Sequence, residues 1–575
     1  MYAIKYGEEF HPHLASFVAA VWQLLTSTGL QVGFTSPLPN LTYFQCKYDL
    51  LVSTALGFLG SVAEQTGNNS LFSDGNALKT ICEQVILPNV GYRQEDEELF
   101  EDNPEEWIRR DLEGSDQATR RRASCDLIRS LSRNFEQQIT EIFGQHINSA
   151  LNSYNTNKSD WKSKEAAVFL VASLGTKKKT ERHGVTETSE ILPVVQFWEE
   201  HISQDMADAA PPIMAATIKF LALFRLIIGA DRLTQALPAL AQLLTHKSAV
   251  VAGYAAFAIE KILMTRDPKT KQPLVDSKRV EPVQDQLLLQ LGQIVNQSEN
   301  ELAARALSRL LALQKDLLAP KLPEVINMLT LRLKQLCANP ARPNFNHNLF
   351  ECIALSIRIL CKAHPSAAAS FEESLMPTFG EILEKDIGEL VPYVFQIMAL
   401  LLQVQNGCPA TYVNMYPQLL LPVLWEASGN VQPLVLLLST FIEKNPQESA
   451  KKEFIPNIEV FSFFLKFFLV FFTKKWFLNN LKTEPLLGIF QKLIASRSND
   501  VHGFALLKAM TCFISPKEMA QYWQSVFLVL FKRLQTAKTA KYCGAFVEYL
   551  ACFAAKHGTE QLRSGFSSHL QPLVA

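Results

Sequence analysis

A helix–turn–helix pattern with a proline in the first helix of each pair recurs through at least the second half of this chain. Apolar residues fall at i, i+4 and i+7 in both helices, so each helix carries one apolar stripe. Five copies align, with their prolines at Pro238, Pro323, Pro377, Pro422 and Pro485. The pattern predicts a stack of helix pairs in which each repeat touches only its neighbours.

The stripes are clear in the copy that contains Pro238. They comprise Leu233, Leu237, Leu240 and Leu244 in the first helix and Val251, Ala255, Ala258 and Ile262 in the second. The repeat period is roughly 40–50 residues, which is the range of HEAT-type α-solenoids. The sequence therefore predicts an all-α fold without strands, a HEAT-repeat superhelix of antiparallel helix pairs. Such a fold offers a long concave surface rather than a buried catalytic pocket, which favours the binding of other proteins.

The charge balance argues against nucleic acid as the main ligand. The chain of 575 residues has 55 Lys and Arg against 56 Asp and Glu, a net charge of −1, and so it has no global basic field. Only 19% of its residues are charged, fewer than in ordinary soluble domains, and helices buried on two sides account for this without a membrane. The ten cysteines are scattered and form no CxxC motif. We interpret them as small buried residues in a reducing compartment.

The sequence lacks the short motifs that carry common enzymatic chemistry. GxxxxGK[ST], GxGxxG after a strand, HExxH and GxSxG are all absent. His11 and His13 flank Pro12, but two histidines without a second pair of ligands do not predict a zinc site. We therefore expect a binding protein that has no catalytic activity, metal or cofactor.

Two stretches interrupt the helical pattern, at 33–46 and around 454–481. The second is rich in Phe, but its uncharged core at 467–472 is far shorter than the roughly 20 residues that cross a bilayer. No membrane insertion is expected, although a membrane-associated protein remains an alternative. Elsewhere we expect helices over residues 8–30, 47–62, 78–90, 123–150 and 163–175, and a basic loop at Lys177–Lys179.

The most polar stretch of the chain runs from Glu95 to Arg122. An acidic block, Glu95 to Glu106, precedes a basic–acidic run, and Trp107 and Ile108 lie inside it as apolar anchors. The segment is too polar to bury and contains Pro104 and Gly114, which predicts an exposed loop. One interpretation is a solvated connection. The other is an inserted loop that docks charged partners, because its arginines and carboxylates are suited to bidentate contacts.

Several collinear motifs carry a resemblance to a known family. They are EEWIRRDLEGSD and TRRRASCDL within Asp102–Leu127, YDLLVS at Tyr48–Ser53, WKSKEA at Trp161–Ala166, FNHNLF at Phe345–Phe350, LSIR at Leu355–Arg358, PYVFQ at Pro392–Gln396, PVLWE at Pro422–Glu426 and FQKLIA at Phe490–Ala495. In these residues the chain resembles the importin-α re-exporters of the importin-β (karyopherin) superfamily. The motifs span most of the chain.

The resemblance implies a transport receptor that binds importin-α cooperatively with Ran-GTP and returns importin-α from the nucleus to the cytoplasm. Nucleoporins are a further candidate class of partner. The family's inserted loop, a contact point and hinge between its two partners, maps here onto the charged segment. The partner-binding residues that the resemblance implies are Glu106, Arg109, Arg110, Asp111, Glu113 and Asp116. A general HEAT scaffold for a multiprotein complex is the alternative function.

The resemblance also divides the chain. It implies central repeats over 1–210 with the inserted loop at about 95–122, and repeats of the C-terminal arch over 211–575 with an atypical Phe-rich insertion at about 454–481. The family's N-terminal arch would precede Met1 and the family chain continues past Ala575, so we expect a chain truncated at both ends. Ran binding by residues 1–575 alone is then expected to be weak or absent, with partial importin-α contact. The departures at 33–46 and 454–481 are interpreted as translated non-coding sequence or a splice variant.

Overall fold

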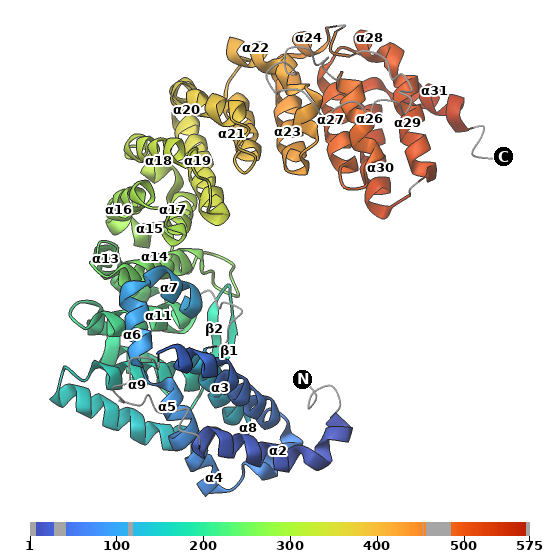
Figure 1. The fold of residues 1–575 in the computed structure, drawn as a ribbon. Helices are drawn as coiled ribbons and strands as arrows, with labels where there is room; N and C mark the ends of the chain where they lie inside the picture. Colours follow the sequence, from blue (N-terminus) through green and yellow to red (C-terminus); the bar gives the residue numbers. More distant parts are fainter. Residues whose placement is uncertain are drawn as a thin grey trace. The chain divides into compact units, whose positions relative to one another are not determined.

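The chain folds into two compact units of helices, Met1–Gln314 and Lys315–Ala575 (Figure 1). The computed structural model describes residues 7–27, 42–112, 119–451, 453–455, 485–536 and 538–570. Residues 33–41 of the interrupted stretch 33–46, most of the Phe-rich segment, and Glu113 and Asp116 lie outside these ranges. Residues 42–46 are helical, so the predicted break is wrong there. The grouping into units does not test the proposed change from central to C-terminal-arch repeats at residue 210, which stays a prediction.

The first unit contains a run of α-helices and one β-hairpin. The helices are α2 (Gly7–Ser27), α3 (Thr42–Ala63), α4 (Gly75–Thr80), α5 (Leu87–Val90), α6 (Gln94–Asp102), α7 (Pro104–Leu112), α8 (Arg120–Thr156), α9 (Trp161–Leu174), α10 (Val194–Phe197), α11 (Pro211–Leu223), α12 (Arg225–Ile228), α13 (Ala230–Leu243), α14 (Ala249–Met264), α15 (Ser277–Val280), α16 (Gln284–Gln297) and α17 (Glu301–Gln314). Short 3-10 or π turns are η1 (Thr66–Leu71), η2 (Ile81–Ile86), η3 (Trp198–Ile202), η4 (Ser203–Met206) and η5 (Glu281–Val283).

The second unit is helical throughout its described residues. Its helices are α18 (Leu322–Leu336), α19 (Pro343–Ala363), α20 (Ala367–Glu384), α21 (Val391–Val404), α22 (Ala410–Leu419), α23 (Ser428–Lys444), α24 (Pro446–Ser449), α26 (Leu486–Ala495), α27 (Asp500–Phe513), α28 (Pro516–Met519), α29 (Trp523–Thr536), α30 (Ala540–His557) and α31 (Thr559–Leu570). The 3-10 turns are η6 (Lys315–Leu318), η7 (Pro422–Trp425) and η8 (Ala520–Tyr522).

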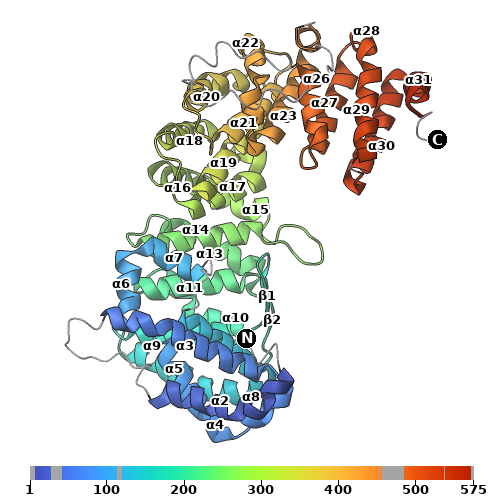
Figure 2. The same cartoon turned by 45° about the vertical axis from the view of Figure 1, so that its right-hand side comes forward.

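Stacked helix pairs build both units, as the repeat pattern predicts (Figures 1 and 2). The pairs α13–α14, α18–α19, α20–α21 and α26–α27 reproduce four of the five aligned copies. The second helix of each pair packs on that of the next, in the orders α11–α14–α17 and α19–α21–α23–α27–α30. Their predicted stripe residues, such as Ile262 and Leu401, are fully buried, so the core runs as a continuous apolar layer between repeats. Phe513, placed in the α27 stripe, is an exception and is 42% exposed.

Pro422 lies outside the helix predicted for it. Pro238 lies inside α13 and Pro323 occupies the first turn of α18, as a proline in the first helix of each pair predicts. Pro422 begins the short turn η7, and α22 supplies the first helix of that repeat instead. Val423, expected in the apolar stripe there, is 47% exposed. Apolar spacing alone does not show where a helix ends, because a short turn can bury the same side chains.

The basic segment at Lys177–Lys179 is a β-strand and not a loop. β1 (Thr176–Thr180) pairs antiparallel with β2 (Gly184–Thr188), and the prediction of no strands is therefore wrong at this hairpin. Gly184 has a φ of 72°, and a Cβ there would lie 2.2 Å from the carbonyl oxygen of Leu223. Only glycine allows this close approach of the hairpin to the end of α11.

Arg225 joins the hairpin to two other segments of the first unit. Its guanidinium donates to the carbonyl oxygens of Glu181 (2.8 Å) and Ala222 (2.5 Å) and to the hydroxyl of Thr265 (2.7 Å). Burial lowers the pKa of Arg225 to about 10, partly offset by the carboxylate of Glu260. The side chain still carries its charge at neutral pH, and its hydrogen bonds satisfy carbonyl groups that the turns leave unpaired.

Among the described residues, no helix combines the length and apolar character that crossing a bilayer requires.

Candidate partner-binding site

The charged segment forms two short helices, α6 and α7, and not the exposed loop predicted from its polarity (Figure 1). Acidic residues fill the first turn of each helix, and Arg109 and Arg110 fill the last turn of α7. Both placements oppose the helix dipole favourably. Asn103 separates the helices, and its side chain accepts a hydrogen bond from the backbone N–H of Glu106 at 3.2 Å. Charge and capping therefore make helices of a sequence that is too polar for a core.

Trp107 and Ile108 anchor α7 on the repeat stack, which confirms their interpretation as apolar anchors. Trp107 is 7% exposed, and its Nε1 donates to the hydroxyl of the buried Tyr254 on α14 at 3.2 Å. Its ring also packs on Tyr92 and Phe100, with centroids 5.3 and 5.5 Å away. Ile108 lies against Gly253. A Cβ added at Gly253 would lie 2.6 Å from Cδ1 of Ile108. The missing side chain of Gly253 gives α7 its close approach to α14.

Asp111 fixes the end of α7 through polar contacts. Its carboxylate accepts from Nζ of Lys219 on α11 at 2.6 Å and from the hydroxyl of Tyr254. Burial works to raise the pKa of Asp111, but Lys219 and the Tyr254 hydroxyl together hold it below its ordinary value. Burial and the Asp111 charge raise the pKa of Tyr254 well above its usual range. Asp111 is thus ionised at neutral pH and ties α7 to two helices of the stack.

Three of the predicted residues form an ion cluster on the outer side of α7. The carboxylate of Glu106 accepts hydrogen bonds from Nε of Arg109 at 2.8 Å and from Nε of Arg110 at 2.5 Å. Hydrogen bonds from Arg110 and Arg109 lower the pKa of Glu106. The side chains of Arg109 and Arg110 are 57% and 41% exposed, so both guanidinium groups remain within reach of an incoming carboxylate. Glu106, Arg109 and Arg110 are brought together, whereas Asp111 points into the stack.

The support beneath α7 includes residues that the sequence pattern did not single out. Arg121 makes a bidentate ion pair with the buried Glu165, at 2.6 and 2.7 Å, and its guanidinium lies 4.8 Å from the centre of the Tyr92 ring. Tyr92 in turn packs on Trp107. Lys219 and Tyr254 were also missed, because no local pattern marks partners more than 100 positions away from Asp111.

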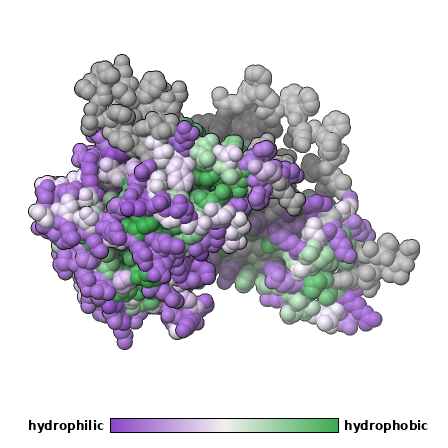
Figure 3. All heavy atoms as spheres, turned by 90° about the horizontal axis from the view of Figure 1, so that it is seen from below, coloured by the Kyte–Doolittle hydropathy of each residue, from purple (hydrophilic) through white to green (hydrophobic). Residues whose placement is uncertain are grey.

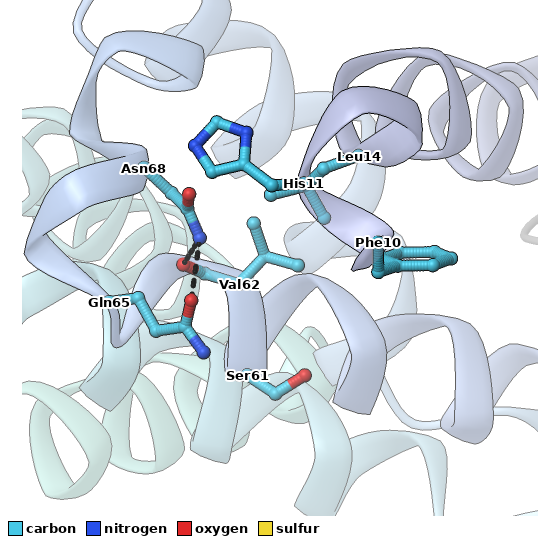
Figure 4. Close-up of a pocket in the computed structure, with 7 residues that line it drawn as sticks. All are labelled: Phe10, His11, Leu14, Ser61, Val62, Gln65 and Asn68. Carbon is cyan, nitrogen blue, oxygen red and sulfur yellow. Dashed lines mark hydrogen bonds between the residues drawn. The ribbon is translucent and has the colours of Figure 1, made fainter. Parts of the chain in front are cut away.

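Two pockets lie away from α7 among the described residues, and the larger, of about 430 Å³, opens between the start of α20 and the turn after α21. A pocket of about 30 Å³ lies between α2 and the end of α3 (Figure 4), which is room for about one water molecule. Its Asn68 is used internally and donates to the carbonyl of Val62 and the side chain of Gln65. Within the described residues no group of three or more His, Cys, Asp or Glu is placed to hold a metal ion. The face shown in Figure 3 is mostly hydrophilic with scattered apolar patches.

Family models cover the chain from end to end. A model described as Cse1 matches residues 1–259, and one described as CAS/CSE protein, C-terminus, matches residues 260–468 and 457–574. Exportin-2 of Oreochromis niloticus is 41% identical over 581 residues, which cover 100% of this chain and 56% of that protein. Exportin-2 of Homo sapiens is 41% identical over 583 residues, with the same coverage.

A solved structure shows the same fold. The structure described as the exportin Cse1 in its cargo-free, cytoplasmic state superposes with a TM-score of 0.83 and 30% identity, over 98% of this chain and 56% of that one. The chain thus spans about half the length of the relatives it matches. The family models and the relatives agree: the chain belongs to the Cse1 (CAS/CSE) family.

Proposed function

We propose that this chain acts as an exportin for importin-α, which it binds together with Ran-GTP and returns from the nucleus to the cytoplasm. The identity of 41% to Exportin-2 over the whole chain carries this proposal. Such a protein shuttles between the two compartments and performs no chemistry itself, because GTP cleavage belongs to Ran.

The α6–α7 pair supports a role in partner contact. Trp107, Ile108 and Asp111 hold it against the stack, so its outer side chains are presented from a fixed backbone. Rigid presentation reduces the ordering cost of binding. α7 presents Arg109 and Arg110, and the preceding helix α6 carries exposed carboxylates at Glu98, Glu101 and Asp102. This mixed surface suits a partner with both basic and acidic groups, which it can orient by complementary charge.

Cooperation between importin-α and Ran-GTP follows from linkage. If both ligands prefer the same arrangement of neighbouring repeats, each raises the affinity for the other by an equal factor. The stacked helices provide the means, because each repeat contacts only its neighbours and small rotations add along the array. Glu106, Arg109 and Arg110 are the proposed partner-binding residues of this surface. Asp111 acts through the position of α7, and Glu113 and Asp116 stay proposed partner-binding residues from the resemblance alone.

A pulldown with purified importin-α tests the proposal. Residues 1–575 are expected to retain importin-α, with a modest increase in Ran-GTP over Ran-GDP, and to bind Ran-GTP weakly on their own. Arg109→Glu should weaken importin-α retention about 10-fold, because it would place like charges against each other at the interface, which costs binding free energy on the order of 1 kcal/mol or more. Lys269→Glu is the matched control, since it makes the same charge change on an exposed loop after α14.

Three outcomes would count against the proposal. Absence of importin-α binding with either nucleotide would refute it. Equal binding in Ran-GTP and Ran-GDP would contradict the cooperative part and favour a general scaffold. Equal weakening by Arg109→Glu and Lys269→Glu would remove the α6–α7 surface from the contact.

A further inference from the structure

Two thiols from consecutive repeats lie in van der Waals contact in the second unit. Cys512 is close to the end of α27, Cys552 lies on α30, and their sulfur atoms are 3.5 Å apart. Both side chains are half-buried rather than enclosed. Forming a bond of about 2.05 Å requires the sulfurs to approach by about 1.5 Å. Rotation of the two side chains and a small shift of the two helices can together close this gap.

Three further contacts keep these helices in register. Phe504 packs on Tyr542 (ring centroids 5.2 Å apart), Lys508 pairs with Glu548 at 2.6 Å, and the hydroxyls of Thr511 and Tyr549 lie 3.3 Å apart. Each partner is 38 to 40 positions further along the chain, and the positions increase together along both helices. The helices therefore run parallel, and the juxtaposition of the two thiols is one step of a regular ladder.

The other described cysteines differ in how deeply they are buried. Cys82, Cys125, Cys337, Cys352 and Cys361 are buried, whereas Cys408 and Cys543 are half-buried like the pair. Sγ of Cys408 contacts the carbonyl of Pro409 at 3.8 Å. Cys408 therefore provides an internal control of similar exposure for the chemistry of Cys512 and Cys552.

We propose that Cys512 and Cys552 form a redox-sensitive dithiol that closes to a disulfide and ties α27 to α30. The oxidant is a small disulfide such as glutathione disulfide. The inference does not depend on the proposed function. In a reducing compartment a disulfide of this kind is transient and regulatory rather than structural.

The exchange proceeds in two balanced steps. The thiolate of one cysteine attacks a sulfur of glutathione disulfide, its S–S bond breaks, and one glutathione thiolate leaves. The second cysteine, once deprotonated, attacks the protein sulfur of the mixed disulfide, and the second glutathione thiolate leaves. Two protein thiols are oxidised, one glutathione disulfide is reduced to two glutathiones, and the two thiol protons pass to the leaving groups.

Burial and the nearby charges determine the rate of the first step. Burial is the main reason that the pKa of Cys512 is raised, and Cys552 raises it further, while Lys556 and Lys508 act in the opposite direction. Lys508 is itself paired with Glu548, and Tyr549 faces the same helix boundary. The thiolate fraction is small at neutral pH, so the reaction is expected to be slow there and to accelerate as the pH rises towards 9.

Mass spectrometry of the native chain after glutathione disulfide treatment tests the proposal. Trypsin leaves Cys543 and Cys552 in one peptide (542–556) and Cys512 in another (509–517), so a Cys543→Ser background makes the assignment unique. After treatment at pH 8.5 and blocking of free thiols, the two peptides are expected as one linked species that dithiothreitol separates. The melting temperature of the oxidised chain should rise by a few degrees and fall back on reduction.

Further controls keep the result interpretable. Adding Cys552→Ser should abolish the linked species and leave Cys512 as a glutathione adduct. Linking should also drop at least 10-fold in guanidinium, which removes the native juxtaposition. The proposal is wrong if Cys512 and Cys552 remain free or singly modified while Cys408 has already reacted. It is equally wrong if linking is as efficient in the unfolded chain.

Discussion

The helices α7 and α23 are both packed against repeats, but by different forces. α23 buries Leu434, Leu438 and Phe441 against its neighbours. Its polar links lie at the margins of this layer and include Gln403 to Thr440 at 3.3 Å and Lys444 to the carbonyl oxygen of Gln405 at 2.6 Å. α7 buries only Trp107 and is otherwise fixed by hydrogen bonds and an ion pair. Burial of apolar surface stabilises strongly but tolerates small rotations of a helix. Directed polar contacts stabilise less but fix one orientation. Apolar burial therefore holds the repeats together, whereas directed contacts fix the position of α7.

Truncation of an apolar residue in α23 should have the largest effect. Phe441 is fully buried and stacks on Tyr416 with centroids 4.1 Å apart, so Phe441→Ala should destabilise the second unit by about 3–5 kcal/mol. Denaturant unfolding followed by circular dichroism measures this. Leu436→Ala on the same helix, where the side chain is 42% exposed, is the control and should cost less than about 0.5 kcal/mol. Equal effects would mean that α23 is not packed as described.

Removing the carboxylate of α7 should have an intermediate effect. Asp111→Ala leaves Lys219 and the Tyr254 hydroxyl without their acceptor, which should weaken the docking of α7 by about 1–3 kcal/mol. Amide hydrogen exchange should speed up in α6 and α7 but not in α23. Glu106→Ala, on the outer side of the same helix, should leave exchange nearly unchanged. Loss of protection throughout the first unit would show that α7 is part of the core and not a docked element.

Acid should loosen α7 selectively, by less than the Asp111→Ala substitution, because a protonated carboxyl can still hydrogen-bond. The folded pKa of Asp111 is below its ordinary value of 3.8. Its contribution is therefore complete above about pH 4 and declines as the pH falls through the folded value. The difference in fluorescence between the chain and its Trp107→Phe variant follows this loosening. A transition that is unchanged in Asp111→Asn would assign it to another group.

Filling the space at Gly253 should have a smaller effect, about 1 kcal/mol, because the atom that must move is the terminal methyl of Ile108. Gly253→Ala should raise exchange in α7, and adding Ile108→Val should restore protection. Gly57→Ala is the control, since nothing lies within 4 Å of a Cβ there and the helix gains propensity. If protection is not restored in the double variant, the contact assigned between Gly253 and Ile108 is wrong.

The exposed ion cluster should contribute least to stability. Arg109→Ala is expected to change the free energy of unfolding by less than about 0.5 kcal/mol, because solvent and salt screen surface pairs. Thermal melting at low and at 0.5 M salt measures this. A loss of more than 1 kcal/mol would place Arg109 among the structural contacts of α7.

The sequence was sufficient to predict the repeats because their stripes are local and regular. The spacing predicts buried faces for Leu237, Ala258 and Ile262, and all three are fully buried. The hairpin at Thr176–Thr188 was missed because its lysines dominate the composition, although Lys177 and Lys178 are paired with Glu136 and Glu187. The alternation of Val185 with polar neighbours was the only local signal of a strand.

The site was predictable in part. Trp107 and Ile108 stood out as apolar residues in a charged run, and both proved to be contacts. The helical state of α6 and α7 was not predicted, because high polarity hides the favourable placement of acids at helix starts. The inward role of Asp111 depends on Lys219, 108 positions away, and such tertiary partners leave no periodic trace in a single sequence.

Arg225 sets a practical limit on how the first unit can be altered. One guanidinium donates to acceptors in three separate segments, at Glu181, Ala222 and Thr265. Lengthening any one segment would move the guanidinium and weaken its hydrogen bonds to the other two. Grafted peptides or fluorescent labels are best kept away from residues 181–184. The exposed residues 268–272 around Lys269 supply none of these three acceptors and are the better place to attach them.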